Sequence, residues 1–358
     1  MSNNCTPNIQ ARLSAMSRLG MAAPSSGALA LAFSPQNGAE VQAQMVQKNG
    51  KNSVYSITYV NANCAAVDTC ATNDCSQSAT DSGSLTTCTT FNSFDCYASH
   101  WEKIGISTLR DLGSETVTNA FAARLWGQMN KIKDKIDIAL VAALSTGAGY
   151  VQDGAATRLL KLIDANGAPI FTVDTEILAD MGDAGFSGVT PLLLGNRIVT
   201  KFAKGQLAGG LNNAGVNLGA QNRFPVFYDN NVNATNAAPD TAGNDVMFSV
   251  LPGLVNTLTW SENAGIFASR NTPQRWDAVD PTSLIMEGSS FMHTVIEDPN
   301  TGMLFDLNVV YEPKCKDWSY QIKCYYKNLI LPVTGCSFTS FNGITKYDVC
   351  PDVAIACA

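Results

Sequence analysis

A long amphipathic segment between residues 113 and 144 constrains the fold of this chain more than any other feature. Its apolar residues recur every three or four positions, which places them on one face of a helix. These predicted core residues are Val117, Phe121, Leu125, Met129, Ile132, Ile136 and Leu140. Ser114 can cap the start of the helix, and the glycines at 147 and 149 can end it. At about 1.5 Å per residue the helix would be roughly 45 Å long, so we expect a spine on which other elements pack.

The charged residues of this segment are expected to lie on the opposite side of the helix. They face solvent or a neighbouring chain in this interpretation: Lys131, Lys133, Asp134, Lys135 and Asp137. The last part of the segment, residues 136–144, is apolar nearly all round. It therefore has to be covered on more than one side.

The low content of charged residues indicates that much of the surface is not freely solvated. Lys, Arg, Asp and Glu make up 15% of the 358 residues, against roughly 25% in an average domain. Either large surfaces are buried against other subunits, or the surface is neutral and rich in Asn, Ser, Thr and Gly. The net charge of -7 without a basic cluster argues against nucleic-acid binding. No apolar run approaches the roughly 18–20 residues of a membrane span, and residues 24–27 interrupt the apolar stretch that imitates a signal peptide.

The eleven cysteines fall into two clusters, with Cys5 alone. Candidates for disulfide bonds, within one chain or between chains, are Cys64, Cys70, Cys75, Cys88, Cys96, Cys315, Cys336, Cys350 and Cys357. Cys324 occupies an inward strand position and is expected to be a buried thiol. Without a C-x-x-C pair a zinc site is disfavoured. Disulfides in such polar surroundings are typical of proteins that leave the cell, virions included.

No set of residues predicts catalysis. The two histidines, His100 and His293, have the sequence context of structural residues. The chain contains no nucleophile elbow, no phosphate-binding loop and no dinucleotide fingerprint. We therefore predict a protein that is not an enzyme and needs neither cofactor nor metal.

The first hundred residues predict an extended region. Residues 1–38 are small, polar and punctuated by Pro and Gly, which is typical of an arm. Two strand-like runs around Asn49 and Gly50 predict a hairpin. Residues 61–95 are polar without an apolar period, so they are expected to be disordered or to pack outside their own domain.

Residues 150–243 predict a compact α/β region. The expected elements, in chain order, are a hairpin at about 158–173, a helix begun near Asp174, a buried strand at 191–195, a helix at 196–207 and a strand at 224–229.

The remaining chain is rich in strands. Residues 245–251 and 255–260 are expected to form one antiparallel pair, and residues 291–297 and 303–311 another. Residues 317–332 alternate, with Trp318, Tyr320, Ile322 and Cys324 on one face. Such alternation predicts an antiparallel sheet covered on one side, for which the long helix is the natural cover.

This order of elements resembles the major capsid protein of tailed bacteriophages, the Hong Kong 97-type fold. The local text is also similar in four segments: 190–202 (TPLLLGNRIVTKF), 224–229 (FPVFYD), 245–265 (DVMFSVLPGLVNTLTWSENAG) and 303–332 (MLFDLNVVYEPKCKDWSYQIKCYYKNLILP). The resemblance implies an α+β fold with an N-terminal arm, an extended β-hairpin loop, a long spine helix with a peripheral sheet, and an α/β axial domain. It places the arm at 1–38, the extended loop with its Cys-rich insertion at 39–100, the spine helix of the peripheral domain at 101–149, the axial domain at 150–243, the peripheral-domain strands and return at 244–335, and a Cys-containing tail at 336–358.

The resemblance implies a structural protein that self-assembles as hexamers and pentamers into an icosahedral shell. The shell would enclose double-stranded DNA without sequence-specific binding and without a membrane. Its partners would be a portal, other virion proteins and, because nothing before residue 40 is long enough for a built-in scaffolding domain, a separate scaffolding protein. Its location would be the virion, after assembly in the host bacterial cytoplasm. The alternative is a secreted or surface-displayed Cys-rich binding module, which would remain monomeric.

Overall fold

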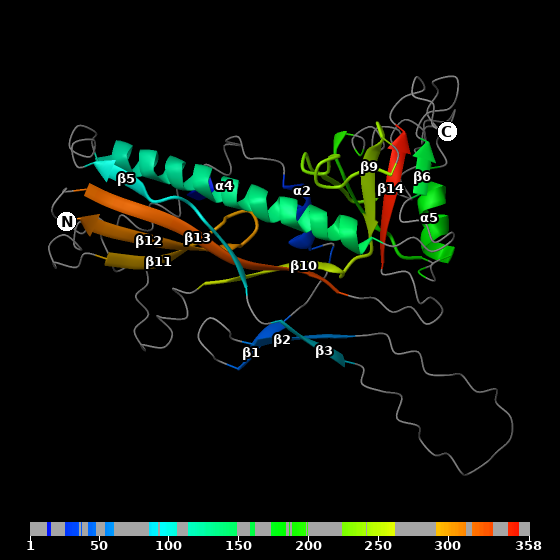
Figure 1. Ribbon diagram of the computed structural model, residues 1–358, viewed down its shortest axis with the longest axis horizontal. Coiled ribbons are helices and arrows are strands. Elements are labelled where there is room, and N and C mark those ends of the chain that lie inside the picture. The colour runs from blue at the N-terminus through cyan, green and yellow to red at the C-terminus, as the bar shows by residue number, and fades with distance from the viewer. Residues whose placement is uncertain are drawn as a thin grey trace, which may run out of the picture. The chain divides into compact units, whose positions relative to one another are not determined.

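The structure is a computed structural model that describes part of the chain (Figure 1). The described residues are 13–15, 26–35, 37, 42–47, 54–60, 86–91, 94–105, 114–148, 158–161, 173–183, 186, 188–197, 199, 224–240, 242–261, 291–312, 317–331 and 343–350. The chain divides into two compact units. The first unit comprises Met1–Leu29, Phe94–Asp137 and Thr257–Lys327, and the second comprises Ala30–Ser93, Ile138–Asn256 and Asn328–Ala358.

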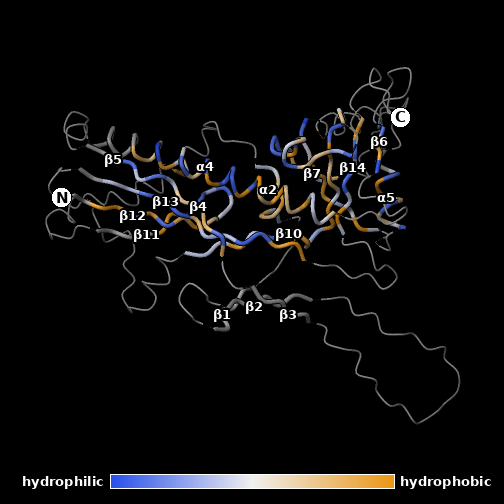
Figure 2. Tube along the Cα trace, in the orientation of Figure 1, coloured by the Kyte–Doolittle hydropathy of each residue, from blue (hydrophilic) through white to orange (hydrophobic). Residues whose placement is uncertain are grey.

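The predicted spine helix is confirmed. Helix α4 runs without interruption from Ser114 to Gly147 and is 34 residues long. Its residues up to Asp137 belong to the first unit and those from Ile138 to the second. Hydrophobic and hydrophilic residues alternate along α4, as Figure 2 shows. No helix within the described ranges is long and apolar enough to cross a membrane.

A six-stranded sheet lies beside α4 (Figure 1). Its central path is β10 (Val255–Trp260), β13 (Asp317–Ile330), β12 (Leu304–Glu312) and β11 (Phe291–Glu297), while β4 (Asp95–Ala98) and β5 (Glu102–Gly105) also pair with β13. Strands β11 and β12 form the expected antiparallel hairpin. Its turn includes Gly302, whose φ of +71° lies in the left-handed region that favours glycine.

The alternation predicted for β13 is also confirmed where side chains are described. Tyr320, Ile322 and Cys324 are fully buried, and the residues between them are partly exposed. The side chain of Trp318 lies outside the described part. Because successive strand residues point to opposite faces, β13 has one covered face and one more open face.

The second unit contains a five-stranded sheet covered by helix α5 (Val173–Asp183). The strand order is β6 (Arg158–Lys161), β14 (Ile344–Cys350), β9 (Asp245–Val250), β7 (Leu192–Gly195) and β8 (Val226–Tyr228). The helix near Asp174 and the strands at 191–195 and 224–229 are therefore as predicted. Side chains from α5 and the sheet share one core: Leu160, Ile177, Leu193, Val199, Phe224, Met247, Tyr347 and Val349.

The predicted pairing of residues 245–251 with 255–260 is wrong. Strand β9 lies between β14 and β7 in one sheet, and β10 pairs with β13 in the other. The intervening turn bonds to distant segments instead of closing a hairpin, since the Gly253 N–H donates to Asn37 Oδ1 at 2.9 Å. The Leu251 N–H donates to the Gly343 carbonyl, and the Leu254 carbonyl accepts from the Leu331 N–H. The sequence of a short Pro-Gly turn between two apolar runs is the same whether the turn closes a hairpin or connects two sheets.

Two predicted terminal extensions contain packed elements. Residues 336–358 were expected to form a tail, but residues 344–350 form β14, buried along its whole length between β6 and β9. Residues 1–38 were expected to form an extended arm, but helix α2 (Gly27–Ala32) has fully buried side chains, among them Leu29 and Leu31. Polar residues interleaved in β14 hid that strand, and α2 is only six residues long, too short to show a helical period.

A separate three-stranded sheet has the order β1 (Gln42–Gln47), β2 (Val54–Val60) and β3 (Thr86–Phe91). The hairpin of β1 and β2 is as predicted. For residues 86–91 the expectation of no contact within the domain is wrong, because β3 pairs along β2. Its sequence TTCTTF is rich in β-branched threonine, which favours strands without an apolar alternation.

Two further predicted elements lie outside the described residues: the helix beyond residue 199 and the second strand of the hairpin expected at about 158–173.

Candidate functional site

The apolar face of α4 packs against the six-stranded sheet in the first unit. Phe121 is half-buried, and its ring meets the Tyr320 ring of β13 edge-on, with centroids 5.0 Å apart. The predicted core positions Leu125, Met129, Ile132, Ile136 and Leu140 are buried, whereas the side chain of Val117 lies outside the described part. Between Phe121 and Ile136, α4 thus supplies the apolar cover that the sheet requires.

A polar contact on one side of this face joins β5, β13 and α4. The Tyr320 hydroxyl donates to Glu102 Oε2 at 2.6 Å, and Gln128 of α4 also hydrogen-bonds to Glu102. The hydrogen bond from Tyr320 is the main cause that lowers the pKa of Glu102, and burial with the same bond raises the pKa of Tyr320. A charged acceptor strengthens such a bond.

The pKa shift of Glu102 predicts a pH dependence. Because the pKa is lower in the folded chain, the contact stabilises above the unfolded pKa and is lost as the pH falls through the folded pKa. Glu102→Gln should therefore lower the urea midpoint of unfolding at about pH 7, and this deficit should shrink as the pH falls below the ordinary pKa of a glutamate side chain. Urea titrations of both proteins across this range measure it. A deficit that is the same at every pH would contradict the assignment.

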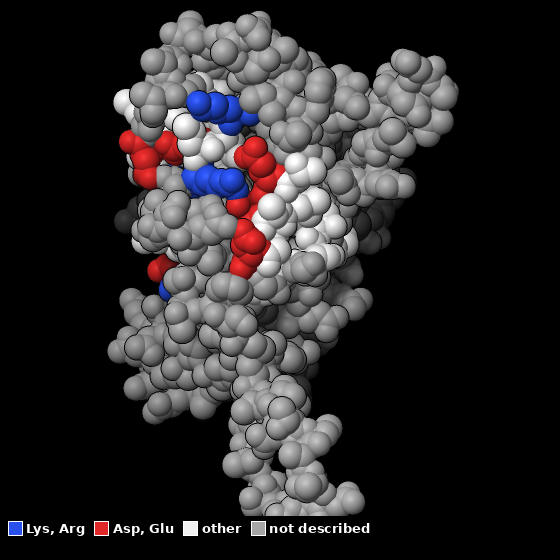
Figure 3. Space-filling view, turned by 90° about the vertical axis from the view of Figure 1, so that its right-hand side faces the viewer, with Lys and Arg blue, Asp and Glu red and all other residues white. Residues whose placement is uncertain are grey.

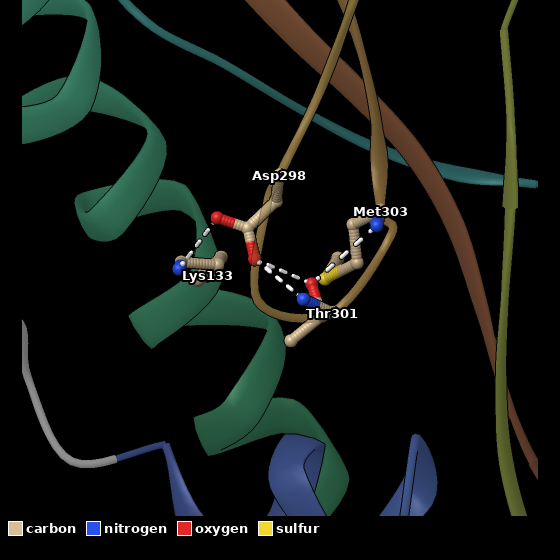
Figure 4. A network of polar contacts seen from close by, with 4 residues as sticks. All are labelled: Lys133, Asp298, Thr301 and Met303. Atoms are coloured by element: carbon tan, nitrogen blue, oxygen red, sulfur yellow. Dashed lines mark hydrogen bonds and ion pairs between the residues drawn. The ribbon is translucent and has the colours of Figure 1, made fainter. Parts of the chain in front are cut away.

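The β11–β12 turn docks on α4 through a buried ion pair (Figure 4). Lys133 Nζ lies 3.0 Å from Asp298 Oδ1, and the two side chains are only 7% and 0% exposed. The other carboxylate oxygen accepts from the Thr301 N–H at 3.0 Å and from the Thr301 hydroxyl at 2.6 Å. Lys133 Nζ also lies 5.2 Å from the centre of the Trp126 ring, within the range of a cation–π contact. Asp298 thus shapes its own turn and fastens it to the helix.

The burial of Lys133 corrects the sequence prediction. Lys133 and Asp137 were expected to face solvent or a neighbouring chain, but both are buried. The Leu29 N–H of α2 donates to Asp137 Oδ1 at 3.0 Å. Trp126, Asn130, Lys133 and Asp137 recur at helical spacing and form a second buried stripe along α4. That spacing was visible in the sequence, but a stripe containing two charged residues is ordinarily read as a solvated face.

The second unit has its own buried polar contact. Arg158 of β6 forms an ion pair with Asp180 of α5, whose second oxygen accepts from the Tyr347 hydroxyl of β14 at 2.9 Å. Burial first, and the Asp180 charge second, raise the pKa of Tyr347. Glu176 also lies within 3.9 Å of Arg158. Figure 3 shows the face of the molecule that lies on the right-hand side of Figure 1. The described basic side chains on this face lie beside acidic ones and form no uninterrupted basic patch.

The candidate cysteines are described only in part. Cys96 lies exposed on β4, and Cys350 is buried at the end of β14. Cys88 lies in β3 but its side chain is outside the described part, as are Cys64, Cys70, Cys75, Cys315, Cys336 and Cys357. Cys324 is buried as expected, and burial raises the pKa of its thiol, which makes it a poor nucleophile. Cys350 is disulfide-bonded, and the pairing of the other candidate cysteines stays a prediction.

The two histidines are described in part. His100 is exposed between β4 and β5, and the side chain of His293 in β11 lies outside the described part. Among the described residues no three His, Cys, Asp or Glu side chains are grouped so as to hold a metal ion. The contacts that the structure does describe are structural: they fix helices and turns to sheets.

Comparison with known proteins gives a likeness of structure only. No protein-family model matches the chain, and no curated protein matches it. Among solved structures it is similar to one from Mycobacterium phage Adephagia, with 13% identity over 94% of both chains and a TM-score of 0.44. It is also similar to the cyanophage A-1(L) capsid asymmetric unit, with 10% identity over 84% of this chain and 89% of that chain and a TM-score of 0.48. A third is the capsid structure of Staphylococcus phage Andhra, with 8% identity over 87% of this chain and 83% of that chain and a TM-score of 0.39.

The chain is similar to phage capsid structures. The matched regions extend over most of the chain. The TM-scores of these three structures lie below 0.5 and their identities below 15%. What the chain does therefore has to be inferred from its own residues.

Proposed function

We propose that this chain is a capsid protein that assembles with copies of itself into a closed icosahedral shell. The observation that carries the proposal is the three-stranded sheet β1–β2–β3, which in the described part of the chain pairs only within itself. Its register sets Met45, Tyr55 and Phe91 opposite one another across the three strands. Ala43, Ile57 and Thr89 form the next row on the same face. Rows of apolar residues across a sheet have to be buried against another element, and in this proposal a neighbouring copy supplies that cover.

The charge distribution supports the same function. Buried ionisable groups form internal contacts, as Lys133 does with Asp298 and Asp180 does with Arg158. With only 15% charged residues, a large part of the remaining surface is neutral and suited to contact between subunits. The acidic balance suits a container, because firm contacts with DNA phosphates require Lys and Arg.

The proposal also covers the oligomers, the finished shell and its partners. Copies would form hexamers and pentamers, as the resemblance implies, and each surface patch would meet its complement on a neighbour. The finished particle would be a virion shell of the Hong Kong 97 type that is built in the bacterial cytoplasm around double-stranded DNA. A separate scaffolding protein, a portal and other virion proteins would be its partners. Cysteines of residues 64–96 would form disulfides after release, mostly within that segment.

Sedimentation of the purified chain tests the proposal. The chain, co-expressed with its candidate scaffolding protein, should sediment as one large species. A variant in which residues 62–84 are replaced by a short Gly/Ser turn keeps β2 and β3, and it should give a folded, soluble subunit that forms no stable shell. A wild-type chain that sediments only as a monomer would contradict the proposal and favour the Cys-rich binding module.

A further inference from the structure

The second buried stripe of α4 contains polar atoms that no described group of the chain hydrogen-bonds. Trp126 is 3% exposed and Asn130 is 4% exposed. Among the described residues, no group hydrogen-bonds to the Trp126 indole Nε1 or to the two amide atoms of Asn130, Nδ2 and Oδ1. Leaving a buried polar group unpaired costs about 1–3 kcal/mol, so three such atoms in one place require an explanation.

These atoms belong to one place on the helix. Asn130 follows Trp126 by four residues, which puts the two Cβ atoms about 5–6 Å apart on the same side of α4. The next residues of the stripe are occupied: Lys133 pairs with Asp298, and Asp137 accepts from the Leu29 N–H. The atoms of Trp126 and Asn130 therefore lie in the interior of the first unit, on the side of α4 where Asp137 meets α2 and Lys133 meets the β11–β12 turn.

The chemistry of the site selects its ligand. The indole offers one N–H donor, and the amide offers two N–H donors and one acceptor oxygen. An anion would meet the carboxylate of Asp298, which pairs with the Lys133 ammonium 5.2 Å from the Trp126 ring. A cation would meet mainly N–H donors and the Lys133 ammonium. A small neutral molecule that both donates and accepts fits all three atoms, and water is the commonest such ligand inside proteins.

We propose that Trp126 and Asn130 hold ordered water in the interior of the first unit. A water between the two side chains accepts from the indole N–H and donates to Asn130 Oδ1, and a second accepts from Asn130 Nδ2. The two buried sides of α4 then differ in character. The side toward the sheet, with Leu125, Met129 and Ile136, is dry, and the side toward α2 and the β11–β12 turn is hydrated.

Gln128 is not part of this site. Its Oε1 also lacks a partner, but its side chain hydrogen-bonds to Glu102 and it lies two residues along the helix from both Trp126 and Asn130. Residues two apart on a helix do not face each other.

A density map of the purified protein that resolves water tests the inference directly. We expect separate water density within hydrogen-bond distance of Trp126 Nε1 and of the Asn130 amide. A protein group of the same or a neighbouring chain bonded to these atoms would overturn the inference, and so would an apolar surrounding without density. Either result leaves the proposed capsid function unaffected, because the inference does not depend on it.

A second test uses the unassembled subunit in solution. With 15N-labelled tryptophan, the indole signal of Trp126, assigned by its loss in Trp126→Phe, should exchange slowly with deuterium and still show a cross-relaxation peak at the water frequency. The exposed Trp101 serves as a control for fast exchange. A slowly exchanging Trp126 signal without a water peak would contradict the site.

Discussion

Leu125→Asp is expected to yield no soluble subunit and no particles. Leu125 is fully buried on the face of α4 that covers the six-stranded sheet. The substitution removes a buried leucine, which alone costs about 2–5 kcal/mol. It also places an unpaired carboxylate in an apolar interior, which adds several kcal/mol or forces protonation. Since a typical domain is stable by only about 5–15 kcal/mol, most of the folded population should be lost.

Gly127→Asp is the matched control for this substitution. Gly127 lies two residues along the same helix, is exposed, and has no atom within 4 Å of the position that a Cβ would take. Aspartate there adds the same charge without burial, and replacing a mid-helix glycine favours the helix slightly. Soluble expression of both proteins, followed by urea unfolding, measures the difference. A Leu125→Asp subunit with the unfolding midpoint of Gly127→Asp would show that this face is not core.

Lys133→Met is expected to destabilise the subunit by about 3–5 kcal/mol. The methionine side chain matches much of the volume of lysine, but Asp298 would then remain fully buried without its ion-pair partner. An unpaired buried charge costs more than the pair contributes, because the water that would solvate it is excluded. Urea unfolding of the purified subunit measures the loss.

The double variant Lys133→Met/Asp298→Asn separates the ion pair from the shape of the turn. Asparagine is neutral, and its oxygen can still accept from the Thr301 N–H and hydroxyl, as Asp298 does. The double variant should therefore be more stable than Lys133→Met alone. A double variant no more stable than the single one would mean that the buried charge is not the cause of the loss.

Regular local patterns predicted α4 and β13 correctly. The apolar residues from Phe121 to Leu140 keep a helical period, and Tyr320, Ile322 and Cys324 keep a strand period, because each pattern has one buried face. The α5 helix, the β1–β2 hairpin and the β11–β12 hairpin were predictable for similar reasons.

Contacts between distant segments were not predictable from the sequence. Whether the turn at Gly253 closes a hairpin depends on Asn37, more than 200 residues earlier in the chain. β14 contains Lys346 and Asp348, which are typical of exposed positions. They are buried because Lys346 Nζ donates to the Ala238 carbonyl and Asp348 Oδ1 accepts from the Asp240 N–H. The stripe of Lys133 and Asp137 was misassigned in the same way, since only tertiary partners allow such groups inside.

Assembly with copies of itself is the central claim, and electron microscopy of the purified protein tests it most directly. The chain co-expressed with its candidate scaffolding protein should appear as closed shells of uniform diameter, and Leu125→Asp prepared in parallel should show none. Wild-type protein that is folded by its urea transition, yet seen only as single particles of subunit size under these conditions, would contradict the claim.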